Sequence, residues 1–124
     1  EYLIRLPETI LLRAEAKMRS GDNAGAADDI NLLRKRAQCE YLVQASEVNV
    51  DLILDERARE TYGEMNRWED LVRTETLYER VKEFNPDAAP NIKEYHKLRP
   101  IPQNHIDRLS PKPSAEEAQN EGYY

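Results

Sequence analysis

The sequence has few of the residues that build cross-linked, membrane-spanning or phosphate-binding proteins. Its 124 residues include one cysteine, Cys39, and only four glycines. A single cysteine excludes a disulfide framework and a cysteine-based zinc site within the chain, and no glycine-rich phosphate loop is present. No apolar run approaches the roughly 18 residues of a transmembrane helix. We expect Cys39 to be a small buried hydrophobic residue.

Large apolar side chains are also scarce. Leu, Ile, Val and Phe together make up about one fifth of the residues, close to the level of roughly 20% below which chains tend to stay disordered. Charged residues make up 34% of the chain, and the mean hydropathy is -0.85. We therefore expect a thin core, formed by helices that pack through small apolar residues.

The charge balance argues against a nucleic-acid-binding protein. The net charge at pH 7 is -6, whereas nucleic-acid-binding domains are usually basic. The one short basic run, Arg34-Lys35-Arg36, is interpreted as part of a solvated helix face.

Apolar residues at three- and four-residue steps predict a helical hairpin over residues 7–37. Pro7 suits the first turn of the first helix, and Gly21 suits its C-terminal cap. Asn23 is expected to cap the second helix, which runs to about Ala37. The short link makes the two helices antiparallel neighbours. The inward residues are expected to be Ile10, Leu11, Ala14, Met18, Ala26 or Ala27, Ile30, Leu33 and Ala37.

Three further helices are predicted up to residue 85, after a connector over residues 38–48. Asn49 is expected to cap the third, Gly63 to interrupt it, and Asn66 or Arg67 to begin the fourth. The fifth is expected to end before Asn85-Pro86. The predicted inward residues of these helices are Ile53, Leu54, Ala58, Tyr62, Trp68, Leu71, Val72, Leu77, Tyr78, Val81 and Phe84.

The proline distribution predicts a second region over residues 86–124. Six of the seven prolines lie between Pro86 and Pro113, and proline interrupts regular structure. We expect this region to be largely irregular, with one helical turn near residues 104–106, and to pack on the helical region of residues 1–85.

The helical region contains a weak internal sequence repeat. A shift of 42 residues pairs Leu11-Leu12 with Ile53-Leu54, Ala16 with Ala58, and Gly21 with Gly63. Recurrent small residues and turns at such a period are typical of stacked helical hairpins of the tetratricopeptide kind. The fold class expected is therefore mainly α, with tetratricopeptide-like hairpins followed by a proline-rich, largely irregular segment.

Three glutamates provide the strongest candidate for a polar site. Glu56, Glu60 and Glu64 are spaced by four residues and so project from one helix face. They could form a metal site or an acid/base pair, or they could be paired with arginines in a helix-packing network. The candidate partners are Arg57, Arg67, Arg73, Arg34 and Arg36. No histidine lies three or four residues from these glutamates, so we favour the network.

No other residues form a recognisable catalytic pattern. His96 and His105 are treated as packing or surface residues, and Trp68 as a core residue rather than a ligand platform. Tyr95, Tyr123 and Tyr124 could stack on a sugar or pack on a helix. We expect no catalytic residue, metal or cofactor, and the sequence does not identify ligand-binding residues.

Four motifs, in order, resemble the C-terminal part of the SusD/RagB family of nutrient-binding lipoproteins from Bacteroidetes outer membranes. The first is residues 5–16 (RLPETILLRAEA) with Gly21-Asp22, and the second is residues 30–37 (INLLRKRA). The third runs from Asp55-Glu56-Arg57 through Glu60 and Glu64 to Arg67-Trp68-Glu69-Asp70-Leu71 and Arg73. The fourth comprises Pro100-Ile101-Pro102-Gln103, Ile106 and residues 119–123 (QNEGY).

The resemblance implies a helical protein that binds oligosaccharides or other nutrients and delivers them to a SusC-like TonB-dependent transporter. It implies a binding protein rather than an enzyme, located at the cell surface in the outer membrane. Family members are several times longer and carry a lipidated N-terminal cysteine, so we expect this chain to be a fragment. Two other hypotheses are a soluble tetratricopeptide-type adaptor and a hydrolase that uses Glu56 or Glu60.

Overall fold

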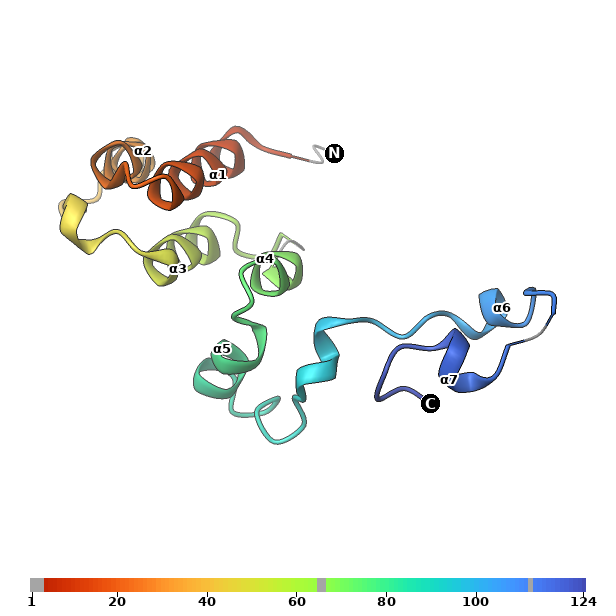
Figure 1. Ribbon diagram of the computed structural model, residues 1–124. Helices are drawn as coiled ribbons and strands as arrows, with labels where there is room; N and C mark the ends of the chain where they lie inside the picture. Colours follow the sequence, from red (N-terminus) through yellow and green to blue (C-terminus); the bar gives the residue numbers. More distant parts are fainter. Residues whose placement is uncertain (1–3, 65–66, 112) are drawn as a thin grey trace. The chain divides into compact units, whose positions relative to one another are not determined.

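The computed structural model describes residues 4–64, 67–111 and 113–124 (Figure 1), and within these ranges the regular elements are helices and no strand is present. The chain divides into two compact units at Asp70 and Leu71. The α-helices are α1 (Leu6–Arg19), α2 (Asn23–Arg36), α3 (Val50–Glu60), α4 (Arg67–Arg73), α5 (Leu77–Phe84), α6 (Gln103–Ile106) and α7 (Ala115–Ala118). The 3-10 turns are η1 (Ala45–Glu47) and η2 (Glu94–Lys97).

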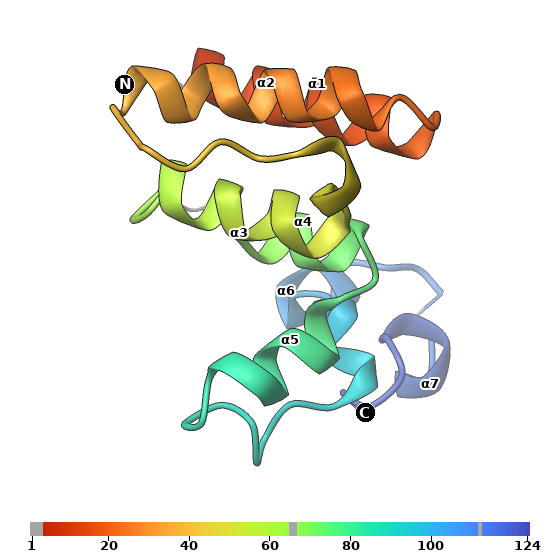
Figure 2. The same ribbon diagram turned by 90° about the vertical axis from the view of Figure 1, so that its left-hand side faces the viewer.

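Helices α1 and α2 form the predicted hairpin and lie side by side in both views (Figures 1 and 2). Helix α1 ends where Gly21 adopts a left-handed φ of 88°, a conformation that glycine adopts at little cost. The cap of α2 differs from the prediction. Asp22 rather than Asn23 accepts the Gly25 N–H, at 2.8 Å, because α2 begins one residue earlier than expected.

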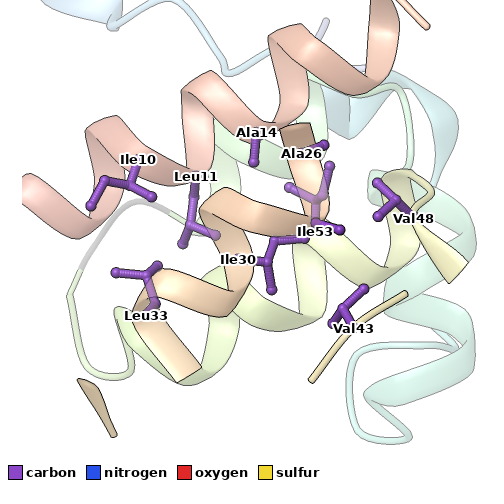
Figure 3. Close-up of a cluster of buried hydrophobic side chains, with 10 residues drawn as sticks. Ile10, Leu11, Ala14, Ala26, Ile30, Leu33, Val43, Val48 and Ile53 are labelled. Atoms are coloured by element: carbon purple, nitrogen blue, oxygen red, sulfur yellow. The ribbon is translucent and has the colours of Figure 1, made fainter. Parts of the chain in front are cut away.

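The core of the first unit lies between this hairpin and α3 (Figure 3). Helices α1 and α2 approach closely because Ala14, Ala26 and Ala27 occupy buried positions. Leu11, Ile30 and Ile53 have no exposed surface at all. The prediction of a thin core packed through small residues is confirmed for this unit.

The connector between α2 and α3 is held to the hairpin by one buried side chain. Asn31 of α2 donates through Nδ2 to the Val43 carbonyl at 2.9 Å, and its Oδ1 accepts the Val43 N–H at 2.8 Å. Val43 is thereby placed in the core (Figure 3). The prediction of a buried Cys39 is wrong, because the chain leaves α2 through a left-handed Gln38 and carries Cys39 to the surface.

Helix α3 begins as predicted, since Asn49 accepts the Leu52 N–H at 2.9 Å. Its predicted C-terminal turn is wrong. The helix ends at Glu60, where the buried Thr61 hydroxyl donates to the Arg57 carbonyl, and Tyr62 is 92% exposed. Trp68, expected in the core, is only half-buried in the first turn of α4.

Several other predicted inward positions are also corrected. Ala37 lies just after the end of α2 and is exposed. Phe84 is 61% exposed at the end of α5, where the helix stops before Asn85 as predicted. Among the described residues, no helix combines the length and apolar character that crossing a membrane requires.

The second unit contains more helical turns than the proline pattern predicts. The turn near residues 104–106 is present as α6, but η2 and α7 were missed. Helix α7 carries a recognisable signal, a capping box in which the Ser114 hydroxyl accepts the Glu117 N–H and Glu117 accepts the Ser114 N–H. Such a box starts a helix even in a proline-rich segment.

Candidate functional site

The three glutamates of the third motif all pair with arginines, as the network hypothesis predicts. Glu56 is bound by Arg34 and Arg59, and Glu60 by Arg36 and Arg5. Glu64 receives a bond of 2.5 Å from Arg5 Nη2. Arg59 belongs to α3 itself, but Arg34 and Arg36 come from α2 and Arg5 precedes α1, so these pairs tie the hairpin to α3 and to the residues after it.

The pair between Arg34 and Glu56 has the geometry of a strong structural contact. Arg34 donates through Nε and Nη2 to the two carboxylate oxygens, at 3.0 and 2.7 Å. The hydrogen bond to Glu56 raises the pKa of Arg34 above its ordinary value, although burial opposes the rise. Bidentate pairs of this kind fix orientation as well as adding energy. The expectation that Arg34 belongs to a solvated face is therefore wrong.

Arg57 lies on a different side of α3 and is the most buried charged residue of the unit. It is 2% exposed and donates through Nε to Asp70 at 2.7 Å, while its Nη2 lies 3.4 Å from a Glu8 oxygen. Arg57 therefore does not neutralise the glutamate face, contrary to one alternative in the prediction. It links α1 and α3 to the first turn of α4.

Arg67, another candidate partner of the glutamates, makes a contact with the backbone of α3. Its Nη1 donates to the Leu54 carbonyl at 2.7 Å. This bond joins the start of α4 to the middle of α3. Arg67 thus acts with Arg57 to hold α4 to α3 through polar contacts.

The geometry of the glutamate face does not favour acid/base chemistry. The carboxylates of Glu56 and Glu60 each accept hydrogen bonds from guanidinium groups, which occupy the lone pairs that a catalytic role would need. Among residues 4–64, 67–111 and 113–124, no group of three or more His, Cys, Asp or Glu could hold a metal ion. The arrangement serves to position helices.

Tyr95, His96 and Tyr123 of the second unit pack against one another. The Tyr95 and Tyr123 rings meet edge to face with centroids 5.2 Å apart, and the Tyr123 hydroxyl donates to the Leu98 carbonyl at 3.0 Å. His96 Nδ1 accepts the Lys93 N–H at 2.8 Å. Of the alternatives left open for Tyr95 and Tyr123, the structure favours packing. Tyr124 is 59% exposed, and His105 is exposed in α6.

One cavity of about 600 Å³ lies within the second unit. It is bordered by the end of α4, by the first turn of α5 and by η2. The lining residues are Leu71, Val72, Glu75, Leu77, Tyr78, Glu79, Lys93, Glu94, Lys97 and Leu98. Sequence reasoning missed it, because a helical stripe that includes Leu77 and Tyr78 is also the pattern of an ordinary core face. Its volume lies within the range of about 300–1,000 Å³ of small-molecule sites.

Comparison with known proteins identifies the family. The model of the SusD family matches residues 1–123. The chain belongs to the SusD family. It is also 38% identical, over 125 residues, to the starch-binding protein SusD of Bacteroides thetaiotaomicron. That similarity covers 98% of this chain and 21% of the relative, so the chain spans about a fifth of the length of that curated protein. No solved structure matches the chain.

Membership of the SusD family accounts for the order of the motifs along the chain. Most residues of the third motif lie in α3 and α4, and Glu56, Arg57, Glu60 and Asp70 among them make ion pairs described above. Those of the fourth motif meet in the second unit, where the Gln119 side chain bonds the backbone of Ile101. The motifs most characteristic of the sequence are thus devices that hold the fold.

Proposed function

We propose that this chain is part of a glycan-binding component of a surface nutrient-uptake system. The observation that carries the proposal is the similarity to a starch-binding SusD protein over 98% of the chain. The glutamate face gives no support to the hydrolase alternative, since arginines occupy its carboxylates. In this role the chain acts as a non-enzymatic helical scaffold within a longer protein.

The proposal includes a location and a partner. The protein is a lipoprotein exposed at the surface of the outer membrane, and it delivers oligosaccharide to a SusC-like TonB-dependent transporter. Within the chain, the α1–α2 hairpin and the 42-residue repeat favour tetratricopeptide-like hairpins over residues 1–85. Residues 86–124 form a proline-rich segment that follows them in the chain.

Two measurements on the protein purified from its own cells test this proposal. Fractionation and intact-mass spectrometry should find a lipidated species much heavier than 14.5 kDa in the outer membrane. Affinity electrophoresis through gels containing starch, xylan, mannan or β-glucan should show retardation by at least one polysaccharide. A soluble species that binds peptides and none of these glycans would favour the adaptor hypothesis instead.

A further inference from the structure

The cavity of the second unit is lined by both apolar and charged side chains. Of its leucines, Leu71 and Leu77 are buried, whereas Leu98 is 48% exposed. Leu98 therefore adds apolar surface to the lining that a ligand can cover. This arrangement is typical of small-molecule sites, in which apolar walls carry a few placed polar groups.

Tyr78 contributes both a ring and a hydroxyl group to the cavity. Lys82 Nζ donates to the Tyr78 hydroxyl oxygen at 3.2 Å and lies 4.8 Å from the ring centroid. Because the oxygen accepts this bond from the ammonium group, the hydroxyl hydrogen is directed elsewhere. Tyr78 can therefore donate a hydrogen bond to an oxygen atom of a ligand.

Glu75 beside the cavity occupies a backbone position that normally favours glycine. Its φ is 59°, and the Thr76 N–H bonds the Leu71 carbonyl while the Glu75 N–H bonds the Val72 carbonyl. These bonds define a Schellman motif after α4, with Glu75 at its left-handed position. The motif places Glu75 among the residues that line the cavity, where its carboxylate can accept a hydrogen bond from a ligand.

The charged side chains that line the cavity indicate the class of ligand. Three carboxylates (Glu75, Glu79 and Glu94) and two ammonium groups (Lys93 and Lys97) surround the cavity. Mixed signs disfavour a strongly anionic or cationic ligand, since each would meet like charges. They provide both acceptors and donors for a neutral molecule rich in hydroxyl groups, and hydrogen bonds to charged groups are the stronger ones.

We propose that this cavity, between the end of α4, α5 and η2, binds part of a neutral oligosaccharide. The sugar ring packs against Leu77, Tyr78 and Leu98 of the lining, and its hydroxyl groups bond Glu75 and the Tyr78 hydroxyl. The ligand class rests on the proposed function, whereas the position of the site rests on the cavity itself.

Two matched pairs of variants in the whole protein test the proposal. Glu75→Gly removes the carboxylate and relieves the left-handed backbone, and Gln38→Gly relieves the same conformation after α2, where φ is 56°. Tyr78→Phe removes the hydroxyl group but keeps the ring, and Tyr62→Phe makes the same change at a site 92% exposed. Each is titrated by calorimetry with short oligosaccharides cut from starch, xylan, mannan and β-glucan.

We expect Glu75→Gly and Tyr78→Phe each to weaken binding about tenfold, as loss of a ligand hydrogen bond does. Gln38→Gly and Tyr62→Phe should leave the affinity unchanged. Equal affinity of all four variants for a sugar that the natural protein binds would overturn this site and leave the proposed function standing. Equal losses in the control variants would also overturn it. Failure of every sugar to bind the natural protein would refute the proposed function and this inference with it.

Discussion

The two units of the chain are stabilised in different ways. In the first unit, three helices and a connector bury a common apolar core (Figure 3). Arg57 of α3 is buried as well, and Arg34 of α2 is half-buried in its pair with Glu56. In the second unit, the described helices α5, α6 and α7 have eight, four and four residues. Helices this short contribute few apolar side chains, so other contacts must order the chain.

Those contacts are mainly bonds from side chains to the backbone of extended segments. Gln119 both donates to the Ile101 carbonyl and accepts the Ile101 N–H, at 2.9 and 2.7 Å. Asn120 donates to the Arg99 carbonyl, and the Tyr123 hydroxyl to the Leu98 carbonyl. Side chains of residues 119–123 thus supply hydrogen bonds to the backbone of residues 98–101, which no strand in the described part of the chain pairs with. The comparison teaches that a proline-rich segment can be ordered by side-chain hydrogen bonds where regular backbone pairing is absent.

The largest loss in the free energy of unfolding is expected in the first unit, from Arg57→Ala. This change leaves the buried carboxylate of Asp70 without its 2.7 Å partner, and breaking a buried pair costs about 3–5 kcal/mol. Urea denaturation followed by circular dichroism measures the loss. Arg59→Ala is the matched control, because the Arg59 side chain is 62% exposed and such pairs contribute about 1 kcal/mol or less. If the two variants lost similar amounts of unfolding free energy, the burial of the Arg57–Asp70 pair would not explain its contribution to stability.

The next effect compares two left-handed glycines, one in each unit. In Gly122→Ala the new Cβ would lie 2.4 Å from Tyr95 Cγ, so overpacking of about 1–3 kcal/mol adds to the backbone cost. In Gly21→Ala nothing lies within 4 Å of the Cβ, so we expect the backbone cost alone, about 1–2 kcal/mol. Hydrogen exchange should show greater loss of protection around residues 95–123 in Gly122→Ala. Equal losses of stability in both variants would contradict this expectation, because they would show that the Tyr95 ring moves away from the new Cβ with no loss of packing energy.

A smaller effect is expected from Gln119→Ala in the second unit. It leaves the Ile101 backbone without both of its side-chain bonds, and each such bond contributes about 0.5–1.5 kcal/mol. Hydrogen exchange at the Ile101 amide is the measurement, with Gln103→Ala as control because Gln103 contacts an exposed Asp107 instead. Unchanged exchange at Ile101 would refute this account of the second unit.

The smallest effect concerns pH and the first unit. Burial by itself raises the pKa of Asp29, but hydrogen bonds from Arg13 and Lys17 outweigh it and hold the pKa below its ordinary value. The stabilisation of the folded state by ionised Asp29 is therefore fully present above the ordinary aspartate pKa of about 4. It is lost as the pH falls through the lower pKa that Asp29 has in the folded state.

Asp29→Asn should cost about 1 kcal/mol at pH 7 and reduce the loss of stability on acidification below about pH 4. Melting curves across this range measure both. Asp28→Asn is the control on the exposed face of the same helix, and we expect it to change neither. A steeper acid transition in Asp29→Asn than in the natural protein would contradict the direction of the pKa shift.

Much of the first unit could be predicted from local sequence. The caps at Asn49 and Gly21, and the buried positions of Ile10, Leu11, Ile30 and Ile53, follow from helix periodicity and capping chemistry. Cys39 and Tyr62 were placed wrongly, because both lie just beyond a helix end. There the direction of the chain depends on a single left-handed residue or cap, which periodicity does not reveal.

The sequence alone determined that the protein is mainly helical, where most of its helices begin and end, and which family it belongs to. These properties depend on residues close together in the chain or on motifs in order. Only the tertiary structure decided which arginine meets which carboxylate, how Gln119 orders Ile101, and that a cavity opens beside Tyr78. Side-chain partners and cavities depend on distances between residues far apart in the chain, and helix periodicity carries no information about those distances.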